Sequence, residues 1–239
     1  DLLIIAGRPA SGKTGFLLTV AKNAALKHKK HVAMFSLEMS NEQLVQRMIA
    51  QETGINTQNL RSGKIDENQW DLFTKAIEVL GDAKIYLDDT PALTPIQMRT
   101  KCRRLHLEHH IDLVLVDYIQ LMSSESRTDN RVQEVSYISR NLKTLARELN
   151  VPVLAAAQLS RAVVQRSDKR PMLSDLGESG SLEQDADIVM FIHKKDEILN
   201  ENDKTELVEL MVAKHRNGPT RDIELVFIKD LAQFYNAAT

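Results

Sequence analysis

Residues 7–14 restrict the fold of this chain more than any other segment. They have the pattern G-x-x-x-x-G-K-T, they directly follow the apolar run at 2–6, and a helical pattern begins at Thr14. A strand, a glycine-rich loop and a helix in this order form a phosphate-binding loop, because N–H groups turn inward at the positive end of the helix. The candidate phosphate-binding residues are Gly7, Arg8, Pro9, Ala10, Ser11, Gly12, Lys13 and Thr14.

Two side chains of this loop carry further chemistry. The Lys13 ammonium is placed to reach the outer phosphates of a nucleotide, and the Thr14 hydroxyl is placed to ligate Mg²⁺. The loop therefore predicts a nucleotide site that uses a magnesium ion.

The rest of the chain continues the alternation of strand-sized apolar runs with helical patterns. Strands are expected at 2–6, 31–36, 84–88, 112–117, 151–156 and 188–193, and helices at 14–28, 40–52, 67–80, 95–109 and 132–149. This order predicts an α/β fold in which helices cover both faces of a mostly parallel, twisted sheet. The runs at 206–213 and 221–228 flank turn residues and predict a C-terminal antiparallel hairpin.

Composition and charge exclude several classes of protein. Of the 239 residues, 43% are apolar and 27% are charged, which is typical of a folded globular chain, and no apolar run is long enough to cross a membrane. The single cysteine, Cys102, cannot form an internal disulfide, so a cytoplasmic location fits best, and its side chain is expected to be a small core or boundary group. The net charge of −2 means that any nucleic acid must bind to a local basic surface.

The organisation of the chain predicts one domain over residues 1–239. We find no internal repeat, low-complexity tract or Pro/Gly-rich linker. Because the first residues already belong to the first expected strand, we expect the chain to be a fragment of a longer protein.

Two carboxylates follow strands that would lie beside the loop. Asp117 ends the run at 113–116, where a carboxylate can hold Mg²⁺ through water, and it is the candidate metal residue. Glu38 follows the strand at 31–36, and as a residue it is equally consistent with a solvated loop position and with a general base. Weaker competitors for the metal role are Asp88, Asp89 and Asp112.

Polar groups further along the chain leave alternatives open. Gln158 follows the strand at 151–156 and is either a plain polar residue or a contact to the terminal phosphate. Lys214, His215 and Arg216 lie at the expected hairpin turn, where they are either solvated or able to reach a neighbouring subunit as an arginine finger. Between 158 and 175, four basic residues outnumber two acidic ones, which gives modest support for a phosphate-backbone contact.

Several strings in this sequence resemble the C-terminal motor domain of DnaB-family replicative DNA helicases. Besides the loop at 7–14, they are Ser36-Leu37-Glu38-Met39-Ser40, Asp117-Tyr118-Ile119-Gln120-Leu121-Met122, Gln158-Leu159-Ser160-Arg161 and Lys214-His215-Arg216-Asn217-Gly218-Pro219-Thr220. The resemblance covers essentially the entire chain in the family's order. It implies a RecA-like fold, a homohexameric ring, ATP and Mg²⁺ sites between subunits, and single-stranded DNA in the central channel.

The resemblance also implies residue roles. Glu38 matches the catalytic glutamate, Asp117 the Walker B aspartate, Gln158 the γ-phosphate sensor and Arg47 an arginine near the nucleotide, while Lys214 and Arg216 match the pair that enters the site of the next subunit. Candidate DNA contacts are Arg161, Arg170, Glu178, Ser179 and Gly180. This chain has Gly177 where similar family members usually carry arginine, which puts DNA affinity in doubt.

For the full-length family member, primase and a helicase loader are the expected partners, and no membrane is expected. The competing interpretations are a recombinase or KaiC-like ATPase of the same fold, a small-molecule P-loop kinase, and a non-catalytic ring. The Arg216-Asn217-Gly218-Pro219 string favours the helicase over the first, and Lys13 with Glu38 argues against the last.

Overall fold

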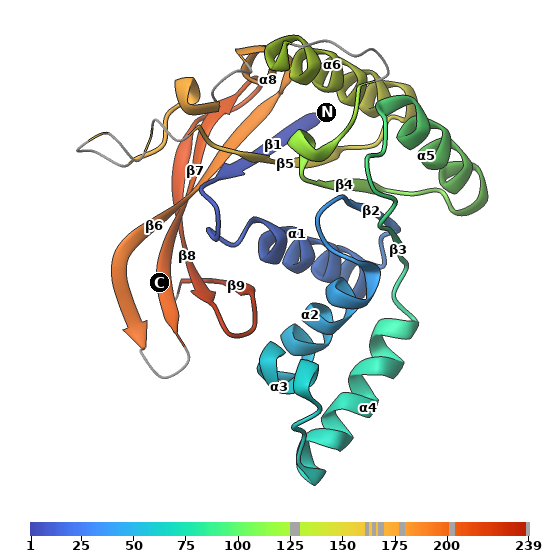
Figure 1. Ribbon diagram of the computed structural model, residues 1–239, viewed down its shortest axis with the longest axis vertical. Helices are drawn as coiled ribbons and strands as arrows, with labels where there is room; N and C mark the ends of the chain where they lie inside the picture. Colours follow the sequence, from blue (N-terminus) through green and yellow to red (C-terminus); the bar gives the residue numbers. More distant parts are fainter. Residues whose placement is uncertain are drawn as a thin grey trace.

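A computed structural model describes residues 1–124, 130–160, 163, 166, 170–176, 180–200 and 204–237 (Figure 1). The strands form one nine-stranded sheet in the order β3-β2-β4-β5-β1-β6-β7-β8-β9. Neighbours from β3 to β6 pair in parallel, and those from β6 to β9 pair antiparallel. The strands are β1 (Leu2–Gly7), β2 (Val32–Ser36), β3 (Ile85–Asp88), β4 (Leu113–Asp117), β5 (Val153–Gln158), β6 (Ile188–Asn200), β7 (Thr205–His215), β8 (Arg221–Ile228) and β9 (Gln233–Asn236).

Helices lie on both faces of this sheet, as the sequence predicts. They are α1 (Lys13–Lys22), which continues as a π-helical turn (Asn23–Lys27), α2 (Asn41–Thr53), α3 (Thr57–Ser62), α4 (Glu67–Gly81), α5 (Pro95–His109), α6 (Arg131–Leu149) and α8 (Gly180–Asp185). Short 3₁₀ helices cover Ile119–Leu121 and Leu173–Leu176. Ser40 and Gln43 form a capping box at the start of α2.

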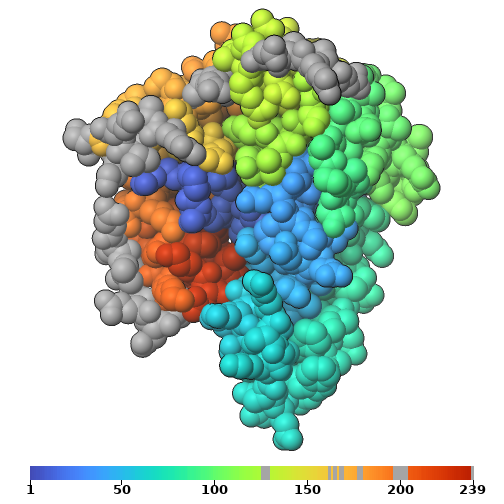
Figure 2. Space-filling view, viewed as in Figure 1, coloured from blue at the N-terminus to red at the C-terminus, as the bar shows by residue number. Residues whose placement is uncertain are grey.

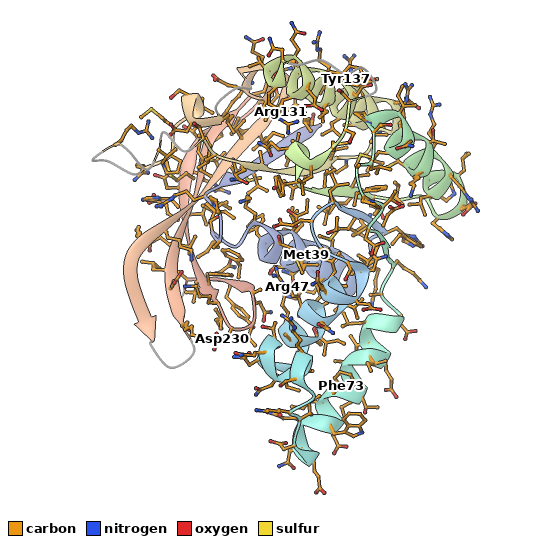
Figure 3. The ribbon with its side chains drawn as sticks, in the orientation of Figure 1. Met39, Arg47, Phe73, Arg131, Tyr137 and Asp230 are labelled. Carbon is orange, nitrogen blue, oxygen red and sulfur yellow. The ribbon has the colours of Figure 1, made fainter. Side chains whose placement is uncertain are left out.

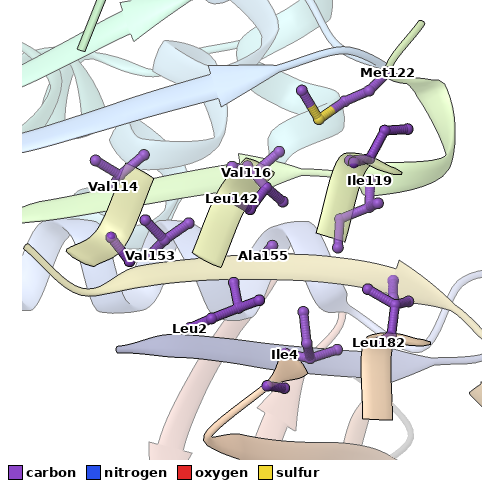
Figure 4. Close-up of a cluster of buried hydrophobic side chains, with 14 of the residues drawn as sticks. Leu2, Ile4, Val114, Val116, Ile119, Met122, Leu142, Val153, Ala155 and Leu182 are labelled. Carbon is purple, nitrogen blue, oxygen red and sulfur yellow. The ribbon is translucent and has the colours of Figure 1, made fainter. Parts of the chain in front are cut away.

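Alternate strand residues pack into two separate cores. Ile4 and Val114 contact α6 residues such as Leu142 on one face (Figure 4), whereas their neighbours Ile5 and Leu115 pack with α1 on the other. Cys102 of α5 is fully buried in the first core, and burial raises the pKa of its thiol to about 12. The thiol is therefore a core group, as expected from the sequence.

The helices α3 and α4 extend away from the sheet at one end of the molecule (Figure 1). Figure 2 shows this extension as a protruding lobe, and α4 leaves Trp70 57% exposed together with Leu72 and Ile77. Among the described residues, no helix combines the length and apolar character needed for a membrane span.

Four elements of the described structure longer than a 3₁₀ turn differ from the sequence-based expectations. The short helices α3 and α8 and the four-residue strand β9 were not expected, and β6 continues to Asn200, past the predicted end at 193. The extension of β6 carries Lys194 and Lys195. In the folded chain they form ion pairs with Glu206 and Glu224 of β7 and β8, so cross-strand charge pairing supports the longer strand.

Asp187, just before β6, links the start of β1 to α6 and to Arg216 after β7, at the edge of the sheet opposite the phosphate-binding loop. Its Oδ2 accepts hydrogen bonds from the Leu2 N–H at 2.8 Å and from the Lys143 ammonium of α6, and its Oδ1 lies 3.5 Å from Arg216 Nη1. Burial alone would raise the pKa of Asp187, but the Lys143 and Leu2 hydrogen bonds and the charge of Arg216 together lower it. The carboxylate thus stabilises the folded chain when it is ionised.

Replacing this carboxylate is expected to destabilise the fold in a pH-dependent way. Asp187→Asn should lower the free energy of unfolding at pH 7 by about 2 to 4 kcal/mol, because the partly buried Lys143 loses its counter-charge. The pKa of Asp187 is lower in the folded chain than in the unfolded chain. The extra stability of the wild type over the variant is therefore fully present above the ordinary aspartate pKa of about 4, and it is lost as the pH falls through the pKa of the folded chain. Urea denaturation at pH 7, 5 and 3 measures the free energy of unfolding of both proteins. A difference between wild type and Asp187→Asn that grows on acidification would contradict the stabilising role of the ionised carboxylate.

Candidate nucleotide site

The register of the parallel strands brings the predicted site residues to one edge of the sheet. Gly7 pairs with Gln158 of β5, and Ser36 pairs with Asp117 of β4. The carboxyl ends of β1, β2, β4 and β5 therefore surround a pocket of about 540 Å³. Its lining includes the predicted residues Pro9, Ala10, Gly12, Lys13, Thr14, Glu38, Arg47, Asp117 and Gln158.

The loop between β1 and α1 has the backbone form of a phosphate cradle. Gly12 has φ +94°, and a Cβ there would lie 2.9 Å from the Phe234 ring of β9, so only glycine fits. The Ser11 N–H donates to the Arg8 carbonyl, and the Lys13 ammonium donates to the carbonyls of Gly7 and Arg8, each at 3.1 Å. Burial lowers the pKa of Lys13, while the charges of Asp117 and Glu38 oppose that shift.

Asp117 supplies an oxygen pair that fits a hard metal ion. Its side chain is buried, and neither carboxylate oxygen has a hydrogen bond of regular geometry within the described part of the chain, although the Thr14 hydroxyl lies close enough to lower its pKa. Burial outweighs that effect and raises the pKa of Asp117, and the charge of Glu38 adds to the rise. Carboxylate and hydroxyl oxygens are the ligands that Mg²⁺ prefers, so Asp117 and Thr14 fit such an ion.

Glu38 reaches the same pocket from a turn after β2. The Ser36 hydroxyl donates to the Met39 carbonyl and accepts from the Met39 N–H, and the Leu37 N–H donates to the Asp117 carbonyl at 2.7 Å. These bonds fix the turn next to β4 and leave Glu38 exposed at the mouth of the pocket. A solvent-accessible carboxylate here can contact both a nucleotide and a water molecule.

Arg47 adds a second cation to the pocket from α2. Met39 and Arg47 lie close together near α2 in Figure 3, and both line the pocket. Burial lowers the pKa of Arg47, and the charges of Asp117 and Glu38 counteract this. Lys13 and Arg47 thus face one cavity together with two carboxylates, which suits a ligand that carries several negative charges and a metal ion.

The far wall of the pocket was not foreseen in the sequence. Thr57, Phe227, Lys229 and Ala232 line it, together with Tyr118 beside the candidate metal residue. The turn at 229–232 is fastened to α2 and α3, because Gln51 Nε2 donates to the Ala232 carbonyl at 2.7 Å and the Thr57 N–H donates to the Asp230 carbonyl. These contacts join segments more than 170 residues apart, and no local sequence pattern signals them.

Lys214 and Arg216 lie at the opposite edge of the sheet. The Arg216 N–H donates to the Asp187 carbonyl, whereas Ile192, five residues further along β6, is level with Gly7. At about 3.3 Å per residue this separates Arg216 from the loop by roughly 16 Å along the strands, beyond the reach of its side chain. In its own subunit the Lys214 ammonium donates to the carbonyls of Glu183 and Ala186 at the end of α8.

The candidate DNA contacts are only partly described. Arg161, Glu178 and Ser179, as well as Gly177, lie outside the described residues. Gly180 begins α8 and has open space where a Cβ would lie. The guanidinium of Arg170 forms ion pairs with Glu209 at 3.2 Å and with Asp222 at 2.5 Å, so in this structure it is engaged with β7 and β8.

The competing aspartates have other partners. Asp88 binds Lys101 and accepts from the Thr90 N–H at 3.0 Å, and Asp89 accepts from the Asn41 N–H. Asp112 lies at the amino end of β4, where it accepts from the His31 N–H. These contacts cap turns and join elements, and they leave Asp117 as the aspartate of the pocket.

Comparison with known proteins places the chain in a family. A family model described as "DnaB-like helicase C terminal domain" matches residues 1–236. The chain belongs to this family. The sequence-based resemblance to DnaB-type helicases is thereby confirmed.

Curated DnaB relatives match nearly all of the chain. The chain is 51% identical over 237 residues to the replicative DNA helicase DnaB of Geobacillus stearothermophilus, and 51% identical over 237 residues to the replicative DNA helicase DnaC of Bacillus subtilis (strain 168). Each match covers 99% of this chain but 52% of the relative. The chain thus spans about half the length of these curated relatives.

Two solved structures are similar to the chain to the same extent. One is described as an ATPase domain and superimposes with a TM-score of 0.92 at 38% identity, covering 100% of this chain and 85% of the other. The second is described as a DnaB-like replicative helicase and its interactions with primase, and it matches with a TM-score of 0.92 at 38% identity, covering 100% of this chain and 57% of the other. The predicted fold class, a mostly parallel sheet with a C-terminal antiparallel hairpin, is therefore confirmed by both the topology and these neighbours.

The close approach of Gly15 to the far wall gives a test of this DnaB-type pocket. In Gly15→Ala the new Cβ would lie 2.4 Å from the Ala232 carbonyl oxygen, so the turn at 229–232 must move away from α1. We expect the free energy of unfolding to fall by about 1 to 3 kcal/mol, measured by urea denaturation. The control is Gly81→Ala at the end of α4, where the space is open and stability should be kept or slightly raised. Equal stability of the two variants would show that the turn does not press on α1.

Proposed function

We propose that this chain is the motor domain of a replicative DNA helicase, which hydrolyses ATP with Mg²⁺ between the subunits of a homohexameric ring. Hydrolysis drives the ring along single-stranded DNA and unwinds the duplex at a replication fork. The observation that carries the proposal is the separation of the two candidate charge sets. Lys13, Asp117 and Glu38 share one pocket, while Arg216 lies at the opposite edge of the same sheet.

The pocket residues divide the chemistry among them. Loop N–H groups and the Lys13 ammonium bind the phosphates, and Thr14 with Asp117 would hold Mg²⁺, which neutralises phosphate charge when bound. Glu38 accepts a proton from the attacking water, because it is the exposed carboxylate at the mouth of the pocket. Gln158 contacts the terminal phosphate from the end of β5, and Arg47 adds positive charge beside it.

A second subunit completes the site in this proposal. Arg216 cannot reach the pocket of its own chain, and Lys214 is bonded to carbonyls at the end of α8, so their proposed contact with phosphate requires a neighbour. Arg216 is half exposed and holds the Gln184 carbonyl at 3.2 Å, so a modest rearrangement would present its guanidinium to a nucleotide of the next subunit. Repetition of this contact around a ring is the basis of the homohexamer proposal.

The proposed DNA surface is formed by the segment that follows β5. It includes Arg170 and Gly180, and also Arg161, Glu178 and Ser179, which lie outside the described residues. Backbone N–H groups and cationic side chains can both bind phosphate, so the segment does not depend on a single arginine. Primase and a helicase loader are proposed partners of the full-length protein, which would act in the cytoplasm.

Loss of the proposed base tests the enzymatic function. Glu38→Gln should bind Mg·ATP nearly as well as wild type but hydrolyse it about 10² to 10⁴ times more slowly, because an amide cannot accept the proton. Lys13→Ala should instead weaken nucleotide binding. Turnover is measured with and without single-stranded DNA, which should stimulate the wild type.

The matched control makes the same chemical change one turn away. Glu42→Gln alters an exposed glutamate in the first turn of α2, outside the pocket, and should keep wild-type turnover. Equal turnover in Glu38→Gln and Glu42→Gln would refute the role of Glu38. A wild-type chain whose rate of ATP hydrolysis is unchanged by single-stranded DNA would count against the helicase proposal.

Mixed assemblies test whether Arg216 acts on the neighbouring subunit. Arg216→Ala and Lys13→Ala chains should each be inactive alone, but mixing them should restore some activity, because an intact pocket can then face an intact arginine. We expect recovery to peak near equimolar mixtures when ATP turnover is titrated against mixing ratio. An arginine that serves its own chain would give no recovery at any ratio.

A further inference from the structure

The side chain of Gln120 is joined to the main chain of Gln158 by two hydrogen bonds. Gln120 Nε2 donates to the Gln158 carbonyl at 3.2 Å, and Gln120 Oε1 accepts from the Gln158 N–H at 3.1 Å. A primary amide offers one donor and one acceptor side by side, so it satisfies both backbone groups of one residue at once. Gln120 belongs to the 3₁₀ helix that follows the candidate metal residue Asp117.

This pairing replaces a strand that is missing at the end of β5. On the β1 side, the pairing of β1 with β5 continues to its last pair, Gly7 with Gln158. On the β4 side, the ladder stops at Val116 and Ala155, because the chain turns away after Asp117. Without Gln120, the N–H and carbonyl of Gln158 on that side would lack a strand partner, and the last residues of β5 would be held from one side alone.

The same glutamine is itself anchored to the start of α6. Its carbonyl accepts from the Arg131 guanidinium, whose other nitrogen pairs with Glu134, and Glu134 Oε1 accepts from the Ser124 N–H at 3.2 Å. Arg131 is labelled in Figure 3, where its side chain extends from the α6 end of the molecule. A continuous set of polar contacts therefore links the end of β5 to Arg131 and Glu134 at the start of α6, and through Glu134 to Ser124.

We propose that Gln120 is a positioning residue that sets the place of Gln158 in the nucleotide pocket and couples it to Ser124 and to the start of α6. The inference rests on the proposed function, in which the Gln158 side chain contacts the terminal phosphate. Gln120 does not itself line the pocket, and Gln158 does. A nucleotide with a third phosphate would thus favour one position of Gln158, and through Gln120 and Arg131 one position of the chain at Ser124.

The variant Gln120→Glu tests this role with almost no change in shape. It places a carboxylate oxygen against the Gln158 carbonyl, so one of the two hydrogen bonds becomes a repulsion. Affinity for ATPγS should fall about tenfold relative to affinity for ADP, which lacks the third phosphate, and affinity for ADP should stay within about twofold of wild type. Isothermal titration with both nucleotides measures the ratio of the affinity for ATPγS to the affinity for ADP. Thermal unfolding of each variant is followed in parallel.

Two further variants keep the test specific. Gln133→Glu makes the same change at an exposed position of α6 and should keep the wild-type ratio. Gln120→Met preserves the length of the side chain without its polar atoms, and should lower the ratio even if Gln120→Glu folds poorly. Either Gln120 variant combined with Gln158→Ala should lower the ratio no further than Gln158→Ala alone, because Gln120 acts through Gln158.

The possible results separate the two proposals. A wild-type chain that binds neither ATPγS nor ADP would overturn the proposed function of the pocket, whereas one that binds both equally would overturn the phosphate contact of Gln158 and the role of Gln120 with it. Wild-type discrimination that persists in Gln120→Glu and Gln120→Met would overturn the role of Gln120 alone. Gln120 would have only a structural role if its variants lowered the affinity for ADP and for ATPγS equally. The same would follow if their loss of ATPγS affinity added to that of Gln158→Ala.

Discussion

Parallel pairing of β1 with both β5 and β6 is the constraint on which the other features depend. Parallel strands end at the same edge, so the phosphate-binding loop after Gly7 lies beside Gln158 and near Asp117 without any further device. The sheet then changes direction at β7, whose antiparallel course returns the chain to the other edge and leaves Arg216 there. One topological change therefore separates the groups of the proposed phosphate-transfer site, and we propose that a second copy of the chain brings them together.

Burial shifts the pKa values of three charged groups in the pocket towards their neutral forms. Burial raises the pKa of Asp117 and lowers those of Lys13 and Arg47, while the charge of Asp117 opposes the shifts of the two cations and their charges oppose the shift of Asp117. A bound metal ion and polyphosphate would supply the missing opposite charges to both sets, so the pocket favours its ligands partly by relieving this cost. Glu38 lies at the exposed mouth, where it keeps access to water.

Local sequence patterns were enough to predict the central strands and the residues at their carboxyl ends, because hydrophobic runs and the glycine-rich loop are local signals. They could not predict β9 or the wall at 229–232, whose positions depend on contacts of Gln51 and Gly15 with residues far along the chain. For the same reason, the sequence showed Arg170 as a cation of a polar loop but not its pairing with Glu209 and Asp222. The proposed roles of the pocket residues remain predictions that kinetics must test.

We propose that this fold makes an ATP site which only a neighbouring subunit can complete. ATP turnover per chain, measured as a function of chain concentration together with the native mass at each point, tests this directly. We expect turnover to be nearly absent where chains are monomeric and to rise steeply as assemblies form. Constant turnover per chain down to concentrations at which the native mass is that of a monomer would contradict it.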